Sequence, residues 1–221
     1  MTFCNPEISG VFDTAIPFVN SLVIENQRLF FELITDISEQ IDGCERRSVM
    51  SDGDKILAFS KRAELLTTFV PFEMNRKTLV SKIISAAEKT AVNSENYMKT
   101  MQLMTNIENY IADILSEFDC SLNYPKISPA SIIKAAGIEI DEGDGGLCEK
   151  VVDYMSLVRE FDCEKLFITV NMRSYVTDDD AELFMKTVLD HEFNILMIEN
   201  RDYRRLTYEK RLTVDADLCE F

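Results

Sequence analysis

Apolar residues recur at strand or helix spacing along most of the chain, which predicts a mixed α/β fold. The run from Val19 to Ile24 is rich in β-branched residues and is typical of a buried strand. Asn26 then opens a segment whose apolar positions follow the 3.6-residue period of a helix, and Gly43 is placed to end it. Further short strands are expected at residues 47–50, 56–59 and 65–70, with residues 51–54 as a turn.

The middle of the chain has a different pattern, in which helical spacing is nearly continuous from residue 76 to residue 118. A break at Asn93–Glu95 divides this region into two helices. Two helices joined by so short a connection are expected to form a hairpin.

Alternation of helix and strand returns after Pro125. A short helix at residues 131–136 ends at Gly137, and the expected order continues with helix 147–161, strand 165–170, helix 181–189 and strand 194–198. Strands that alternate with helices predict a parallel sheet. We therefore expect an α/β domain formed by residues 1–75 and 126–221, with an α-helical domain at residues 76–125 inserted into it.

Charge constrains what this chain can bind. The 221 residues include 39 acidic and 23 basic side chains, a formal net charge of −16, and 46% are hydrophobic, which is ample for a core. An evenly acidic surface would repel nucleic acid and anionic membranes. However, residues 76–125 carry 5 basic and 6 acidic side chains, so the excess acid belongs to the α/β domain.

Targeting signals and cysteines predict a cytoplasmic protein with no membrane partner. The N-terminus has no basic leader, and the longest uncharged run, Thr14–Ile24, is too short to cross a bilayer. The six cysteines include no C-x-x-C pair, so we expect reduced, mostly buried thiols.

Motifs for catalysis are weak. The turn after the first long strand reads Glu25–Arg28, without the glycines or the Lys-Ser/Thr of a phosphate-binding loop, which argues against nucleotide hydrolysis. His191 is the only histidine and is expected to be an ordinary surface residue at a helix end. Asp178–Asp180 follow Thr177 and are best explained as the first turn of a helix.

Two kinds of charged cluster are candidates for binding. An acidic loop with three glycines could hold a hard cation, although it fits no EF-hand spacing and could equally be a flexible surface loop; its carboxylates are Glu139, Asp141, Glu142 and Asp144. Basic residues form two sets. One is Arg76, Lys77, Lys82 and Lys89, and the other is Arg201, Arg204 and Arg205 with nearby tyrosines, followed closely by Lys210 and Arg211. Each set is either solvated surface or part of a phosphate-binding track.

Several segments, taken in order, resemble the Csn-type CRISPR-associated proteins of type II-A systems. They are Leu22–Asn26 with Leu29–Phe31, Phe72–Asn75, Ile133–Ile138, Leu166–Tyr175, Ile195–Glu199 and the acidic ending Val214–Glu220. None is a catalytic motif, and the similarity lies in their shared order across most of the chain.

The resemblance implies a P-loop-NTPase-like sheet that lacks a P-loop, joined to a helical lobe. It also implies a homotetrameric ring that threads onto linear ends of double-stranded DNA during spacer acquisition, without catalysis. The implied partners are other CRISPR adaptation proteins and the RNA-guided nuclease of the locus. Bound calcium is implied as well, and Glu117, Asp119 and Asp141 occupy positions similar to the acidic ones of the family, with Glu142 beside them.

Two alternatives to a DNA-binding ring stay open from the sequence. One is a catalytically inactive scaffold for protein interactions within the adaptation complex. The other is a metal-dependent nuclease that uses the acidic loops, which the missing P-loop and the single histidine disfavour.

Overall fold

The computed structural model describes residues 1–221 and divides into two compact units. The α/β unit comprises Met1–Met74 and Glu142–Phe221, and the helical unit comprises Asn75–Asp141. The helical unit extends further than the sequence predicted. Residues 126–141, which we had placed in the α/β domain, belong to it because α5 (Pro129–Ala135) packs against α3 (Lys77–Ala91).

The α/β unit is built on a parallel sheet of five strands. Every neighbouring pair is parallel, which confirms the mixed α/β fold, and the order across the sheet is β6 (Ala63–Leu66), β7 (Leu166–Val170), β8 (Asn194–Glu199), β3 (Val19–Ile24) and β9 (Glu209–Val214). The strand β9, which the sequence pattern did not reveal, forms one edge. The first long strand, β3, therefore lies inside the sheet.

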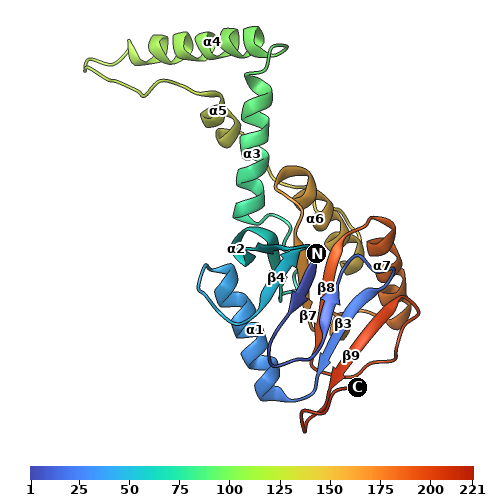
Figure 1. Cartoon of the computed structure of the whole chain (residues 1–221). Coiled ribbons are helices and arrows are strands. Elements are labelled where there is room, and N and C mark those ends of the chain that lie inside the picture. The colour runs from blue at the N-terminus through green and yellow to red at the C-terminus, as the bar shows by residue number, and fades with distance from the viewer. The chain divides into compact units, whose positions relative to one another are not determined.

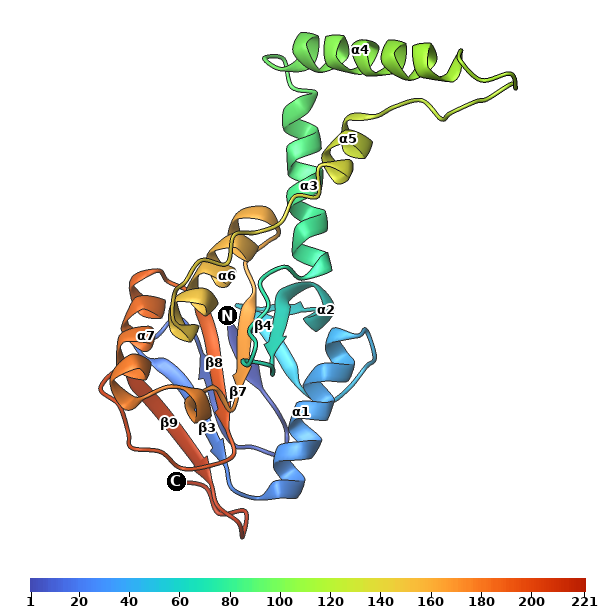
Figure 2. The same ribbon diagram turned by 180° about the vertical axis from the view of Figure 1, so that it is seen from behind.

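Helices cover both faces of this sheet (Figures 1 and 2). Helix α1 (Gln27–Ile41) packs on the face to which Leu22 and Ile24 contribute. Helices α6 (Leu147–Phe161) and α7 (Asp178–Asp190) lie on the opposite face. Because side chains alternate along a strand, Glu199 of β8 and Arg211 of β9 belong to the α7 face.

A small antiparallel sheet completes the α/β unit. Its order is β2 (Val11–Asp13), β1 (Thr2–Cys4), β4 (Val49–Asp52) and β5 (Lys55–Leu57). The predicted strand at residues 56–59 begins one residue earlier and ends at Leu57, because Phe59 starts the short helix α2 (Phe59–Arg62). The predicted strand 65–70 corresponds to β6, which lies two to four residues nearer the N-terminus.

The helical unit contains the two predicted helices but not the predicted hairpin. Helix α4 (Tyr97–Leu115) leaves the end of α3 instead of running back along it (Figure 1). The connection turns on Asn93, whose Oδ1 accepts hydrogen bonds from the backbone N–H groups of Glu95 and Asn96. In a hairpin α4 would pack along α3, but here the short helix α5 packs against α3 instead.

Two further expectations concern membranes and cysteines. None of the helices combines the length and the apolar character needed to span a membrane. All six cysteines are free, but none is buried: Cys44, Cys120 and Cys219 are exposed and the others are partly exposed. The expectation of mostly buried thiols was therefore wrong.

Candidate nucleic-acid interface

The connection between β8 and β9, residues 200–208, carries one of the two predicted basic sets, and we call it the basic loop. It joins two strands of the sheet without a helix. The side chains of Arg201, Arg204 and Arg205 are exposed, and none of the three forms an ion pair. With Asp202 included, the loop has a net charge of +2 in a unit that carries 16 basic and 31 acidic residues, net −15.

Arg211 holds the basic loop from β9. Its Nη2 lies 2.7 Å from Oε2 of Glu209, and its Nη1 lies 2.5 Å from Oδ1 of Asp202. The same guanidinium donates to the backbone carbonyls of Tyr203, at 2.5 Å, and Arg204, at 3.3 Å. This one buried side chain thus satisfies two loop carbonyls and two carboxylates.

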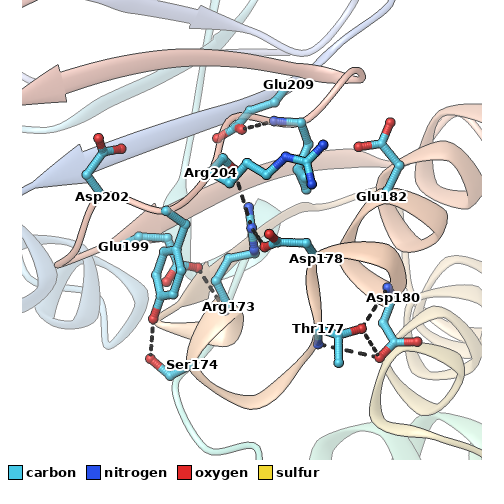
Figure 3. A network of polar contacts seen from close by, with 12 residues as sticks. Arg173, Ser174, Thr177, Asp178, Asp180, Glu182, Glu199, Asp202, Arg204 and Glu209 are labelled. Carbon is cyan, nitrogen blue, oxygen red and sulfur yellow. Dashed lines mark hydrogen bonds and ion pairs between the residues drawn. The ribbon is translucent and has the colours of Figure 1, made fainter.

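Arg173 holds the loop from the other side. It lies in the 3₁₀-helix η1 (Met172–Tyr175), directly after β7, and its side chain is 2% exposed. Its Nη2 lies 2.5 Å from Oδ1 of Asp178 and 3.5 Å from the carbonyl oxygen of Arg204, and its guanidinium lies over the ring of Tyr203. Figure 3 shows Arg173 between Glu199 and Asp178, below the basic loop.

Further bonds fix the ends of the loop. The N–H of Leu206 donates to Oε2 of Glu209 at 3.0 Å, and the N–H of Thr207 donates to both oxygens of Glu182. The hydroxyl groups of Ser174 and Tyr203 lie 2.9 Å apart. The backbone of the basic loop is therefore held from β9, η1 and α7, whereas its three arginine side chains are exposed, with the guanidinium of Arg201 5.4 Å from the centre of the Tyr203 ring.

The two buried glutamates below the loop differ in their protonation. Burial acts to raise the pKa of Glu209, but hydrogen bonds from Arg211, from the Leu206 N–H and from Ser21 outweigh it and hold the pKa below its usual range. Burial raises the pKa of Glu199 to about 7, and the N–H of Arg173, 3.2 Å from Oε1, offsets only part of this. Oε2 of Glu199 has no hydrogen-bond partner, which favours its neutral form.

Glu199 is therefore expected to make the stability of the α/β unit depend on pH. Its pKa is 4.5 in a solvated chain and about 7 here, so the unfolded chain loses this proton first as the pH rises. The resulting contribution to stability is complete below pH 4.5 and is lost as the pH rises to about 7, which amounts to about 3 kcal/mol. Urea unfolding should show that Glu199→Gln lacks this loss, and parallel pH profiles for the variant and the unchanged protein would contradict the assignment.

The second basic set lies on α3. Arg76 is the N-cap residue of this helix, and Lys77, Lys82 and Lys89 are exposed. Lys82 and Lys89 are seven residues apart, about two turns, and share one face, whereas Lys77 projects from a different side. The structure therefore brings Lys82 and Lys89, but not all four residues, onto one line.

The four predicted calcium ligands do not form a site within one chain. Glu117 and Asp119 are exposed beyond the end of α4, and Asp141 is exposed in the segment that leads to α6. The carboxylate of Glu142 accepts a hydrogen bond from the N–H of Met74 at 3.0 Å. No group of three or more His, Cys, Asp or Glu side chains in the chain lies close enough to hold a metal ion.

The places where catalytic chemistry was considered have structural roles. Asn26 caps α1, because its Oδ1 accepts from the N–H of Leu29 at 3.0 Å, so a side chain occupies the position where a phosphate-binding loop would lie. Thr177 caps α7 as predicted, in a capping box with Asp180. His191 is the exposed C-cap of α7, as expected for a surface residue.

These features define an α/β protein with a parallel sheet, an inserted helical unit and a basic loop that connects the end of β8 to the start of the parallel strand β9. A sequence profile described as "CRISPR-associated protein (Cas_Csn2)" matches residues 40–218. The chain therefore belongs to the Csn2 family of CRISPR-associated proteins, as the resemblance in the sequence indicated.

Individual relatives agree with this assignment. The chain is 24% identical over 139 residues to the CRISPR-associated protein Csn2 of Enterococcus faecalis, a match that covers 62% of this chain and 63% of that protein. It is 23% identical over 198 residues to Csn2 of Streptococcus agalactiae, which covers 89% of this chain and 87% of the relative. The crystal structure of Stu0660 of Streptococcus thermophilus has a similar fold, with a TM-score of 0.57 at 10% identity, covering 97% of this chain and 75% of the other.

Sequence reasoning missed the two arginines that hold the basic loop. The sequence pattern places Arg211 with the exposed basic residues and assigns no role to Arg173. A signal for Arg211 existed, because Leu212 and Val214 face α1 and strand alternation then places Arg211 on the opposite, buried face. For Arg173 we find no comparable signal in the local pattern.

Proposed function

We propose that this chain is a non-catalytic DNA-binding protein of CRISPR adaptation, which assembles as a homotetrameric ring and threads onto linear ends of double-stranded DNA in the cytoplasm. The observation that carries the proposal is the basic loop, which exposes three arginines without an ion pair in a unit of net charge −15. In such a unit most cations would be neutralised by neighbouring carboxylates. Here Arg173 and Arg211 take the nearby carboxylates, which leaves the exposed arginines available for phosphates.

The proposed absence of catalysis is supported by the elements that occupy the usual site of an α/β enzyme. We propose that the sheet is P-loop-NTPase-like, since β3 lies inside it and leads directly into α1. The turn between them has Glu25 in place of a phosphate-binding glycine, and Asn26 uses its own side chain to cap the helix. Both features oppose the binding of a nucleoside triphosphate.

The proposed ring requires self-association, and the surface of α4 supports it. Leu103, Ile107, Tyr110 and Ile114 follow one another at spacings of four, three and four residues, which is the spacing of a coiled-coil seam. Leu103, Tyr110 and Ile114 are 51%, 66% and 41% exposed. The helical unit has a net charge of only −1, so charge repulsion does not prevent α4 of a second copy from packing against this surface.

Charges placed on the α4 seam are expected to break the tetramer. The variant Leu103→Lys/Tyr110→Lys should sediment as a smaller species, because two buried cations would face each other across every α4 contact. The control Gln102→Lys/Asn109→Lys adds the same charge to another face of α4 and should remain a tetramer. Sedimentation of the first variant as an intact tetramer would exclude this seam from the assembly.

We propose that other adaptation proteins and the RNA-guided nuclease are partners of the ring. We also propose that calcium is bound in the assembly, with Glu117, Asp119, Asp141 and Glu142 as ligands. Since one chain does not gather these carboxylates, the ion would have to draw on more than one copy. Sedimentation with a chelator tests this in the same experiment: a tetramer that is indifferent to chelation would contradict a stabilising role for calcium.

A further inference from the structure

Glu199 and Arg173 each have a buried polar atom without a partner at the place where the basic loop begins. Glu199 is the last residue of β8, directly before the loop, and is 2% exposed. Its Oε2 accepts no hydrogen bond, and the Nε of Arg173 donates none. The two residues are already joined by the bond from the Arg173 N–H to Oε1 of Glu199, so an unpaired acceptor on one and an unpaired donor on the other indicate that a second arrangement of this pair is available.

Arg173 connects Glu199 to the backbone of the loop. Its N–H donates to Oε1 of Glu199, whereas its guanidinium bonds to Asp178 and, at 3.5 Å, to the carbonyl of Arg204. Any shift of the guanidinium toward Oε2 of Glu199 would lengthen or break the bond to Arg204. That bond is already at the long limit for a hydrogen bond.

Burial favours a bound proton on Glu199, whereas its charged neighbours act in both directions: Arg173 lowers its pKa and Glu209 raises it. Glu199 is faced by Arg173 of η1 and by Glu209 and Arg211 of β9, and Asp178 of α7 lies on the far side of Arg173. With Glu199 ionised, four carboxylates would share two guanidinium groups: the buried Glu199 and Glu209 and the more exposed Asp178 and Asp202. Phosphates bound to the loop would add further negative charge and would therefore stabilise the proton.

We propose that Glu199 is a positioning residue for the basic loop, which acts through Arg173 and places the loop differently according to whether Glu199 carries a proton. When Glu199 is neutral, the guanidinium of Arg173 bonds to Asp178 and to the carbonyl of Arg204, as in this structure. The ionised acid draws the guanidinium to Oε2 and releases that carbonyl. The consequence for DNA affinity rests on the proposed function, whereas the movement of the loop does not.

The chain contains no tryptophan, so a single indole can report on the loop. In Tyr203→Trp, the emission is expected to change between about pH 6 and about pH 8 with a midpoint near the pKa of Glu199, about 7. The change should be absent in Tyr203→Trp/Glu199→Gln and present in Tyr203→Trp/His191→Gln, which removes the only histidine. If Tyr203→Trp does not fold, Tyr208→Trp at the other end of the loop serves as the reporter.

Emission that does not titrate, or that titrates equally without Glu199, overturns the proposal whatever the DNA result. Binding of a linear duplex provides the second measurement. The unchanged protein should lose about fivefold in affinity between about pH 6 and about pH 8.5 relative to Glu199→Gln. Equal losses in both proteins would overturn the link to DNA, whereas no binding at any pH would contradict the proposed function and leave the loop movement to be decided by the fluorescence.

Discussion

Replacing Arg204 and Arg205 together by Ala is expected to lower the affinity for linear double-stranded DNA by at least about 100-fold at about 0.1 M salt. Both side chains are exposed and unpaired, so their removal takes away cations that bind phosphates without leaving a buried carboxylate unpaired. In a tetramer the change is repeated in every copy. The slope of affinity against salt should also fall, by about 0.9 for each DNA phosphate that the variant no longer neutralises.

A matched variant shows whether the loss of affinity depends on where the two basic residues lie or only on the loss of two positive charges. Lys55→Ala/Lys61→Ala removes two exposed basic residues from the same α/β unit but outside the basic loop. Its affinity should stay within a few-fold of that of the unchanged protein, measured by anisotropy over a range of salt. Equal losses in the two variants would mean that DNA responds to overall charge and that the basic loop has no special role.

Replacing Arg211 by Met is expected to destabilise the α/β unit by about 3–5 kcal/mol. Glu209, whose side chain is 1% exposed, would keep its bond from the Leu206 N–H but lose its ionic partner. The carbonyls of Tyr203 and Arg204 would lose their donor as well, so the basic loop should become mobile. Chemical unfolding measures the first effect, and hydrogen exchange of the loop amides measures the second.

Two further variants test whether loss of the buried ion pair between Arg211 and Glu209 causes the loss of stability in Arg211→Met. Arg205→Met makes the same exchange at an exposed position and should change stability by no more than about 0.5 kcal/mol. Adding Glu209→Gln to Arg211→Met should recover part of the loss, because the unpaired charge is then removed. An Arg211→Met protein as stable as the unchanged one would contradict the role given to Arg211.

Local chemistry accounts for the elements that the sequence predicted well. The strand β3 and helix α6 have the predicted bounds, since an apolar run and a helical stripe are read directly from neighbouring residues. The caps at Asn26 and Thr177 were recognisable for the same reason, because a cap depends on residues three positions apart.

Long-range packing accounts for what the sequence missed. The apolar stripe of α4 was correct, but spacing alone does not say which surface covers it, and the structure gives the place beside α3 to α5. The three-residue strands β1 and β2 are too short for a periodic signal. The candidate site was predicted in part: the exposed arginines of the basic loop were identified, whereas the buried arginines that hold it were not, because a basic residue in so acidic a chain is usually solvated.

Threading onto free DNA ends is the core of the proposed function, and one plasmid in two forms provides a direct test of it. The purified protein is mixed with the relaxed closed circle and with the same molecule cut once, so that length, sequence and charge are equal. We expect the cut form to be bound and the closed circle to stay free, and binding to the cut form should weaken steeply with salt. Equal binding of the closed circle and the cut form would contradict threading.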